Sequence, residues 1–190
     1  MDTSLETPSF SVAIADGFIS KGETSIVMQC HDRVFKRVTV LEEGGEKLFT
    51  AESKGVASMS WRRTVKDASG SPLFELRKVA GYTFKTKWVV ESPDGREICS
   101  VRQSSFKQRL ALDVVVQNED DKDNEVMVEV RPKDQNALTT LINVEGASIA
   151  EIQMTGVNTS LNGLDRSVWR ARVAGGVDRA LVSTSCLLCM

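Results

Sequence analysis

Six basic residues in the middle of the chain have the type and spacing to bind phosphate groups. In an extended strand, side chains two or four residues apart project from the same face, so two of these pairs share a face and a third pair recurs at an interval of 25 residues. Ammonium and guanidinium groups bind phosphate through charge-assisted hydrogen bonds. The predicted headgroup-binding residues are Arg62, Lys66, Arg77, Lys85, Lys87 and Arg102.

The charge distribution supports a local patch rather than a uniformly basic surface. Residues 54–109 contain 12 basic and 5 acidic side chains, whereas residues 118–151 contain 3 and 9, and the net charge of the chain is −2. The global basic excess typical of nucleic-acid-binding proteins is therefore absent, and no nucleic-acid partner is expected. The alternative interpretation is that lysine and arginine only solvate the outer face of strands and block their aggregation.

Groups suited to catalysis are few. The only histidine, His31, lies between Cys30 and Asp32. Adjacent side chains of a strand point to opposite faces, so these three residues cannot form a nucleophile, a base and an orienting group within hydrogen-bonding reach. We therefore expect a protein that is not an enzyme.

Metal-binding patterns are incomplete. Cys186 and Cys189 supply two soft ligands, and a structural zinc site needs four. The acidic stretch 118–125 lacks the glycine of a calcium-binding EF-hand loop, because Val126 stands at the sixth position counted from Asp121. The sequence predicts no metal and no cofactor, and a solvated hairpin loop at 118–125.

A repeated hairpin organises most of the chain. Gly45, Gly70 and Gly95 are spaced 25 residues apart, each preceded by an acidic or polar turn and followed by an apolar strand, and Gly146 stands in the same pattern. Two strands, a tight turn that needs a positive φ and a short link account for this period. Continued to about residue 175, it predicts about twelve strands, which is more than an open sheet carries comfortably. We therefore predict an all-β fold that closes into a barrel or a sandwich, and the final segment, described below, favours a closed antiparallel barrel.

Alternation within the strands predicts which side chains face the interior. The inward set aligned from the repeats is Phe49, Phe74, Cys99, Ala150, Ala51, Leu76, Val101 and Ile152, extended by Tyr82, Phe84, Trp88 and Val90 and by Leu110, Leu112, Val114 and Val116. The outward set includes Glu75, Arg77, Ser100 and Arg102. Trp61, Trp88 and Trp169 are interpreted as core residues.

The last segment, 178–190, changes character. It lacks strand alternation, begins with a potential N-cap at Asp178 and is apolar or small on every side. A helix of this composition must be buried, and its length of about 20 Å matches a barrel interior. The alternatives are an exposed hydrophobic tail that anchors the chain to a membrane or partner, and a C-terminal strand.

Several expectations concern organisation and location. Residues 1–9 are predicted to be disordered, and residues 10–190 to form a single domain with the helix at about 178–190. The sequence has no signal-peptide pattern and no apolar run long enough to span a bilayer, which favours the cytoplasm, with a peripheral membrane or nuclear location as alternatives. The four cysteines are then expected to be reduced, and the protein to be a monomer.

The segments EKLFTAES, SPLFELRK, REICSVRQSSFKQRLALDVVV and SIAEIQM, with the Lys87–Trp88 pair and the closing apolar helix, resemble the LURP-one-related family. The resemblance covers about residues 8–190 and is most specific over 96–116. That family is similar to the tubby C-terminal domain, which implies a barrel of about twelve strands around a C-terminal helix. Tubby-like relatives bind phosphoinositide headgroups, but no one-to-one match to a lipid-binding motif is present.

These observations lead to two hypotheses of function. The first is a non-enzymatic tubby-like binding module that docks reversibly on phosphoinositide or another anionic phospholipid through an outer basic face. The second is a protein-interaction or regulatory scaffold that recognises a partner through loops, including 118–125 and the Gly-, Asn- and Ser-rich connection 155–167, which lacks alternation.

Overall fold

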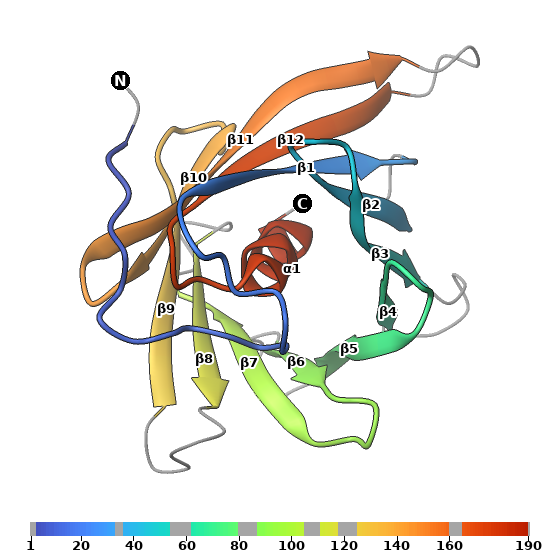
Figure 1. Cartoon of the computed structure of the whole chain (residues 1–190), viewed down its shortest axis with the longest axis horizontal. Coiled ribbons are helices and arrows are strands. Elements are labelled where there is room, and N and C mark those ends of the chain that lie inside the picture. The colour runs from blue at the N-terminus through green and yellow to red at the C-terminus, as the bar shows by residue number, and fades with distance from the viewer. Residues whose placement is uncertain are drawn as a thin grey trace.

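The computed structural model describes residues 3–32, 36–53, 62–79, 87–104, 111–117, 125–159 and 165–189. These residues form a closed antiparallel barrel of twelve strands with one helix inside it (Figure 1). Each strand pairs with its neighbours in the sequence, and the last strand closes on the first. The predicted architecture is confirmed.

The elements follow the chain without a crossover. The strands are β1 (Thr24–Cys30), β2 (Arg37–Glu42), β3 (Lys47–Ser53), β4 (Arg63–Asp67), β5 (Pro72–Val79), β6 (Lys87–Glu91), β7 (Glu97–Gln103), β8 (Leu112–Gln117), β9 (Glu125–Pro132), β10 (Thr139–Val144), β11 (Ala147–Thr159) and β12 (Asp165–Val173). The helix is α1 (Arg179–Cys189).

The 25-residue repeat is a repeat of one hairpin geometry. Gly45, Gly70 and Gly95 have φ angles of 86°, 93° and 87°. Each donates its N–H to the carbonyl three residues earlier, at 2.9, 3.1 and 2.9 Å. A register shift lies beside each turn in the β2–β3, β4–β5 and β6–β7 pairs. Positive φ is cheap only for glycine, so these glycines set the register of three successive hairpins.

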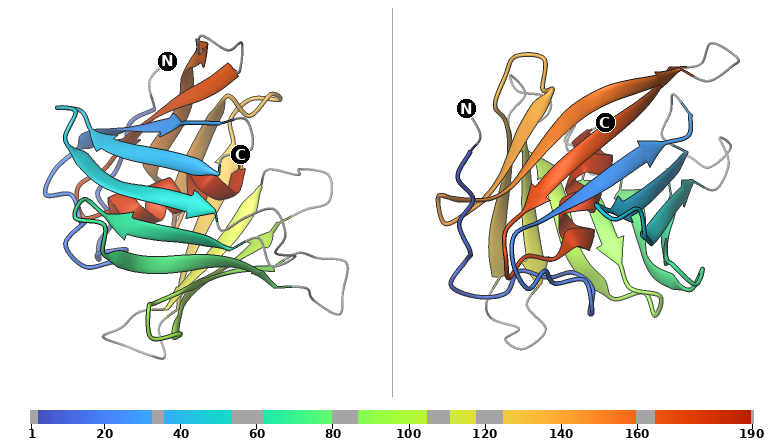
Figure 2. Two further views of the ribbon diagram at one scale, coloured as in Figure 1. Left: turned by 90° about the vertical axis from the view of Figure 1, so that its right-hand side faces the viewer. Right: turned by 45° about the horizontal axis from the view of Figure 1, so that its top comes forward.

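Side chains from the strands and from α1 fill the interior. Figure 2 shows α1 lying along the barrel. The inward positions aligned from the repeats are at most 2% exposed at Phe49, Phe74, Cys99, Ala150, Ala51, Leu76, Val101 and Ile152. Val90, Leu112, Val114 and Val116 are also buried, and Trp88 and Trp169 are partly buried against the core. Tyr82, Phe84, Leu110 and Trp61 lie outside the described residues.

The helix is buried on all sides, as its composition predicts. Ala180, Leu181 and Val182 have no exposed surface, and Cys186 and Leu187 are 2% and 3% exposed. The hydroxyls of its buried serines donate to carbonyls one turn earlier, Ser183 to Arg179 and Ser185 to Leu181, which satisfies them without an external partner. The alternatives of an exposed tail and of a C-terminal strand are both excluded.

Asp178 ties the start of α1 to the N-terminal segment. Its Oδ1 accepts the N–H of Ala180 at 2.7 Å, which confirms the predicted N-cap. Its Oδ2 accepts the N–H groups of Ile14 and Ala15 at 2.8 and 2.9 Å. Burial raises the pKa of Asp178, and the three N–H donors oppose this shift. Residues 12–20 are thereby held across one end of the barrel.

The segment before residue 10 contacts residues that are far away in the sequence. The N–H of Glu6 donates to the carbonyl of Ser148 at 2.9 Å, and the hydroxyl of Thr3 donates to Glu151 at 2.9 Å. Arg172 donates to the carbonyl of Thr3 at 3.2 Å. A polar, turn-rich sequence gives no sign of these contacts because they depend on partners about 140 or more positions away along the chain.

The 155–167 segment differs from the prediction of a loop. β11 and β12 continue their pairing through it, from Gly156 opposite Val168 to Thr159 opposite Asp165, after a register shift beside Met154. Thr, Val and Asn at 155–159 are compatible with a strand when a partner strand supplies the hydrogen bonds. The long hairpin that results extends away from the rest of the barrel in Figure 1.

Two further findings concern the described residues. No helix among them is long and apolar enough to cross a bilayer. Cys30, Cys99 and Cys186 are buried, and burial raises the pKa of Cys30 and of Cys99.

Candidate functional site

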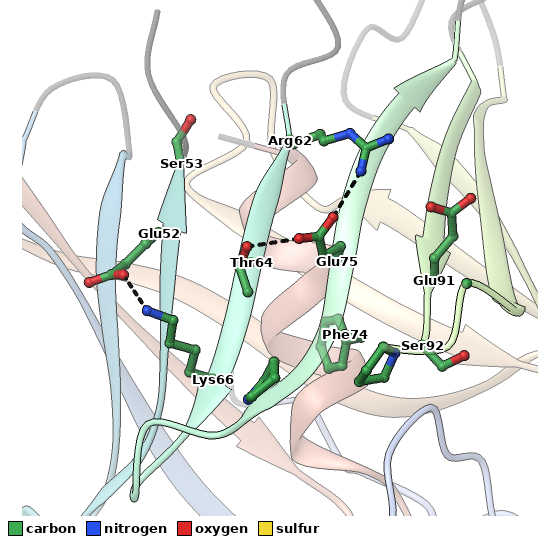
Figure 3. A pocket seen from close by; sticks show the side chains of 12 residues that line it. Glu52, Ser53, Arg62, Thr64, Lys66, Phe74, Glu75, Glu91 and Ser92 are labelled. Atoms are coloured by element: carbon green, nitrogen blue, oxygen red, sulfur yellow. Dashed lines mark hydrogen bonds and ion pairs between the residues drawn. The ribbon is translucent and has the colours of Figure 1, made fainter. Parts of the chain in front are cut away.

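Two of the predicted headgroup-binding residues line a groove on the outer face of β3 to β6. Arg62 and Lys66 flank Thr64 on the outward side of β4, as their spacing predicts, and the groove has a volume of about 550 Å³ (Figure 3). We call it the paired groove. Its lining residues are Glu52, Ser53, Arg62, Thr64, Lys66, Pro72, Phe74, Glu75, Glu91, Ser92, Pro93 and Gly95.

Both cations of the paired groove already have acidic partners. Arg62 Nη1 lies 3.1 Å from Glu75 Oε2, and Thr64 donates to the other oxygen of Glu75 at 3.2 Å. Lys66 Nζ lies 2.9 Å from Glu52 Oε2. Figure 3 shows the two contacts side by side across β3, β4 and β5, with Glu91 apart from them on β6.

The neighbouring strands continue this pairing. Arg77 binds Glu91 with two hydrogen bonds, one of them 3.1 Å from Nε to Oε2, and Lys87 Nζ lies 3.0 Å from Glu97 Oε1. The Lys87–Glu97 contact passes along the strands where Val89 and Ser100 face each other. Val89 and Ser100 are only 3% and 7% exposed, although they occupy outward positions of their strands. Ser100, which the sequence places on the outward face, is therefore buried.

The pairing changes what the groove can bind. A hydrogen bond from Arg77 lowers the pKa of Glu91, and a hydrogen bond from Lys66 lowers the pKa of Glu52. Both carboxylates therefore stay ionised at neutral pH and neutralise their cations. The described lining of the paired groove contains three carboxylates and two cations. This balance of charge does not favour binding of an anion.

Of the predicted residues that remain, Arg102 lies at one rim of the barrel. Arg102, near the end of β7, is exposed and stands opposite Lys87 in register. Lys78, near the end of β5, stands opposite Trp88 at the same rim. Neither forms an ion pair within the part of the chain that the structure describes. Lys85 lies outside the described residues.

We call Arg62, Lys78, Lys87 and Arg102 the basic rim, since they occupy the same end of four neighbouring strands, β4 to β7. Neighbouring strands lie about 4.8 Å apart, but the Lys87 ammonium is directed along the strands to Glu97, so Lys78 and Arg102 supply the charge that remains at the rim. Lys78 was not among the residues predicted from the sequence. The signal that could have found it is its position, because the last inward residue of a barrel strand lies at the opening.

The same end holds the carboxyl terminus of α1. Arg63 Nη1 donates to the carbonyl of Leu187 at 2.9 Å. Burial lowers the pKa of Arg63, and the charge of Asp32 opposes this effect. A cation at this position satisfies a carbonyl that the helix itself cannot, so Arg63 has a structural role.

The groups considered for catalysis and metal binding show no assembled site. His31 Nε2 lies 2.7 Å from the hydroxyl of Thr39 and is only partly exposed. Among the described residues, no three His, Cys, Asp or Glu side chains are grouped closely enough to hold a metal ion. Of the acidic stretch 118–125, only Glu125 is described.

Comparison with known proteins decides the family. The family model described as LURP-one-related matches residues 24–190. The chain belongs to the LURP-one-related family. A crystal structure of an Arabidopsis thaliana protein has a TM-score of 0.66 to this chain at 15% sequence identity, covering 94% of this chain and 96% of that one. At this identity the likeness shows a common fold. The comparison with curated proteins gave no significant match.

Proposed function

We propose that this LURP-one-related protein is a non-enzymatic binding module that docks reversibly on anionic phospholipid, a phosphoinositide above all, through the basic rim. The observation that carries the proposal is the placement of two basic residues without an acidic partner among the described residues, Lys78 and Arg102, at the same end of β5 and β7. Such cations gain electrostatic energy near an anionic surface.

The sequence of the adjoining connections supports the same end of the barrel. Residues 54–61, 80–86 and 105–110, which join β3 to β4, β5 to β6 and β7 to β8, contain Lys54, Lys85, Lys107 and Arg109 and no acidic residue. These three stretches lie outside the described residues, and their composition contributes to the basic excess of residues 54–109. Because α1 fills the interior, a ligand must be recognised on the outside of the barrel.

Vesicle co-sedimentation tests the proposal. The double variant Lys78→Gln/Arg102→Gln removes the two rim charges that have no acidic partner among the described residues, and Lys21→Gln/Lys47→Gln is the matched control at exposed positions away from the rim. At about 1 kcal/mol per basic residue, the rim variant should lower binding to phosphatidylcholine vesicles containing phosphatidylinositol bisphosphate roughly thirtyfold, and the control should change it less than about twofold. Equal losses, or binding that ignores the phosphoinositide, would refute the proposal.

The scaffold hypothesis predicts a different response to salt. Headgroup attraction weakens as ionic strength rises, whereas an apolar protein interface does not. Vesicle binding that disappears in high salt supports docking through the basic rim. Vesicle binding that persists in high salt and in the rim variant contradicts it.

A further inference from the structure

A second groove lies at the opposite end of the barrel, where β9 begins and β10 turns into β11. It has a volume of about 710 Å³, a size typical of ligand-binding sites. We call it the acidic groove. Its lining residues are Phe10, Glu125, Val126, Met127, Glu129, Val144, Glu145 and Gly146.

The acidic groove has an apolar surface open to solvent. Met127 is 52% exposed, which is the highest value among the large hydrophobic side chains that the structure describes as exposed. Phe10, from the N-terminal segment, and Val126 are only partly buried. Methionine is flexible and polarisable, so it adapts to different apolar partners.

The carboxylates of the acidic groove are not neutralised as those of the paired groove are. Among the described residues, no lysine or arginine lines it. Within the same residues Glu125 accepts the amide of Gln117 at 3.0 Å, and Glu129 shares Arg131 with Asp113. Glu145 forms no ion pair with another described residue.

We propose that the acidic groove binds a cationic segment of a partner protein that places an apolar side chain against Met127 and Phe10. Lysine or arginine residues flanking that side chain pair with Glu125 and Glu145. The charge of the groove repels nucleic acid and anionic lipid, and its apolar surface distinguishes it from a site for a simple cation. This site is separate from the basic rim, so both can be occupied together.

Selection from displayed random peptides tests the chemistry without a known partner. We expect the full chain to enrich peptides that combine lysine or arginine with a large apolar residue, and to bind one of them more weakly as salt increases. Enrichment of acidic or uncharged peptides, or no enrichment, would overturn the proposal.

Variants of the groove then assign the site. Glu145→Asn should weaken an enriched peptide about threefold, as expected for an exposed ion pair, and Met127→Thr about tenfold, as for an apolar contact at the centre of an interface. The matched controls are Glu46→Asn, in an exposed turn at the same end, and Leu138→Thr, at an exposed apolar residue outside the groove. Equal losses in controls and groove variants would overturn the assignment.

Failure of this proposal is distinguishable from failure of phospholipid docking. The rim variant Lys78→Gln/Arg102→Gln should keep its affinity for the enriched peptide, and Glu145→Asn should keep vesicle binding. A peptide displaced by loss of the rim charges would place its site at the rim and refute the acidic groove.

Discussion

The two ends of the barrel are built differently. At the end where α1 starts, which we call the turn end, strands are joined by the short segments 43–46, 68–71, 92–96 and 145–146, with 118–124 as the longer exception. At the end where α1 finishes, the exit end, the connections are 31–36, 54–62, 80–86, 104–111, 133–138 and 160–164. Short turns fix strand register, whereas longer connections are where binding proteins place variable chemistry.

The two ends also differ in charge. Carboxylates predominate at the turn end, at Glu42, Glu43, Glu46, Glu125 and Glu145, and the basic rim lies at the exit end. The amino terminus of a helix carries partial positive charge and its carboxyl terminus partial negative charge. Each end of the barrel therefore has the charge that favours the helix terminus inside it.

The largest expected effect comes from the anchor at the turn end. Asp178→Ala leaves three N–H groups without their acceptor and should lower the free energy of unfolding by about 3 to 5 kcal/mol. Urea denaturation measures the loss. Asp16→Ala, at a nearby exposed aspartate, is the matched control and should change stability by less than about 0.5 kcal/mol. A similar loss in both variants would show that Asp178 does not hold the N-terminal segment.

The same residue gives a pH dependence. Because the folded-state pKa of Asp178 is raised above its unfolded value, its stabilising contribution is complete below about pH 4 and decreases as the pH rises through the folded value. Asp178→Asn cannot titrate. The stability of the wild type relative to Asp178→Asn should therefore fall as pH rises. A difference that grows instead would show that the N–H donors outweigh burial.

A smaller effect is expected at the exit end. Arg63→Met removes the hydrogen bond to the carbonyl of Leu187 and should destabilise the protein by about 1 to 2 kcal/mol, because the apolar stem is kept and one acceptor is lost. The neighbouring Arg62→Met, which breaks an exposed ion pair, should cost at most about 0.5 kcal/mol. Thermal unfolding of both variants measures the contrast, and equal values would contradict a capping role for Arg63.

The smallest effect is a gain. Glu145 has a φ of 51°, in the left-handed region where asparagine is tolerated better than glutamate. Glu145→Asn should therefore raise the free energy of unfolding by about 1 kcal/mol or less, while Glu46→Asn should not. Denaturant titration of the two variants compares them. A loss of stability at Glu145 would show that its carboxylate stabilises the fold and is not free for a ligand.

Much of the fold could be predicted because local patterns dictate it. Gly45, Gly70 and Gly95 specify their turns through a backbone angle that other residues avoid. Alternation assigned Phe49, Phe74 and their equivalents to the core, since a strand has only two faces. Asp178 was recognisable as an N-cap from the residues that follow it.

The candidate site was less predictable. The sequence supplied the cations but not their partners, because Glu75 and Glu91 come within reach of Arg62 and Arg77 only across neighbouring strands. The pairing of residues 156–159 with β12 was not predicted either, because this stretch shows no alternation of apolar and polar residues.

By itself, therefore, the sequence determined which segments become strands, where they turn, which side chains enter the core and that the final segment is a buried helix. These properties depend on backbone angles and on burial, which neighbouring residues dictate. Only the tertiary structure decided which charges are neutralised and which stay available, at the basic rim and in the acidic groove. An ion pair depends on the distance between two atoms, and that distance exists only after the barrel has closed.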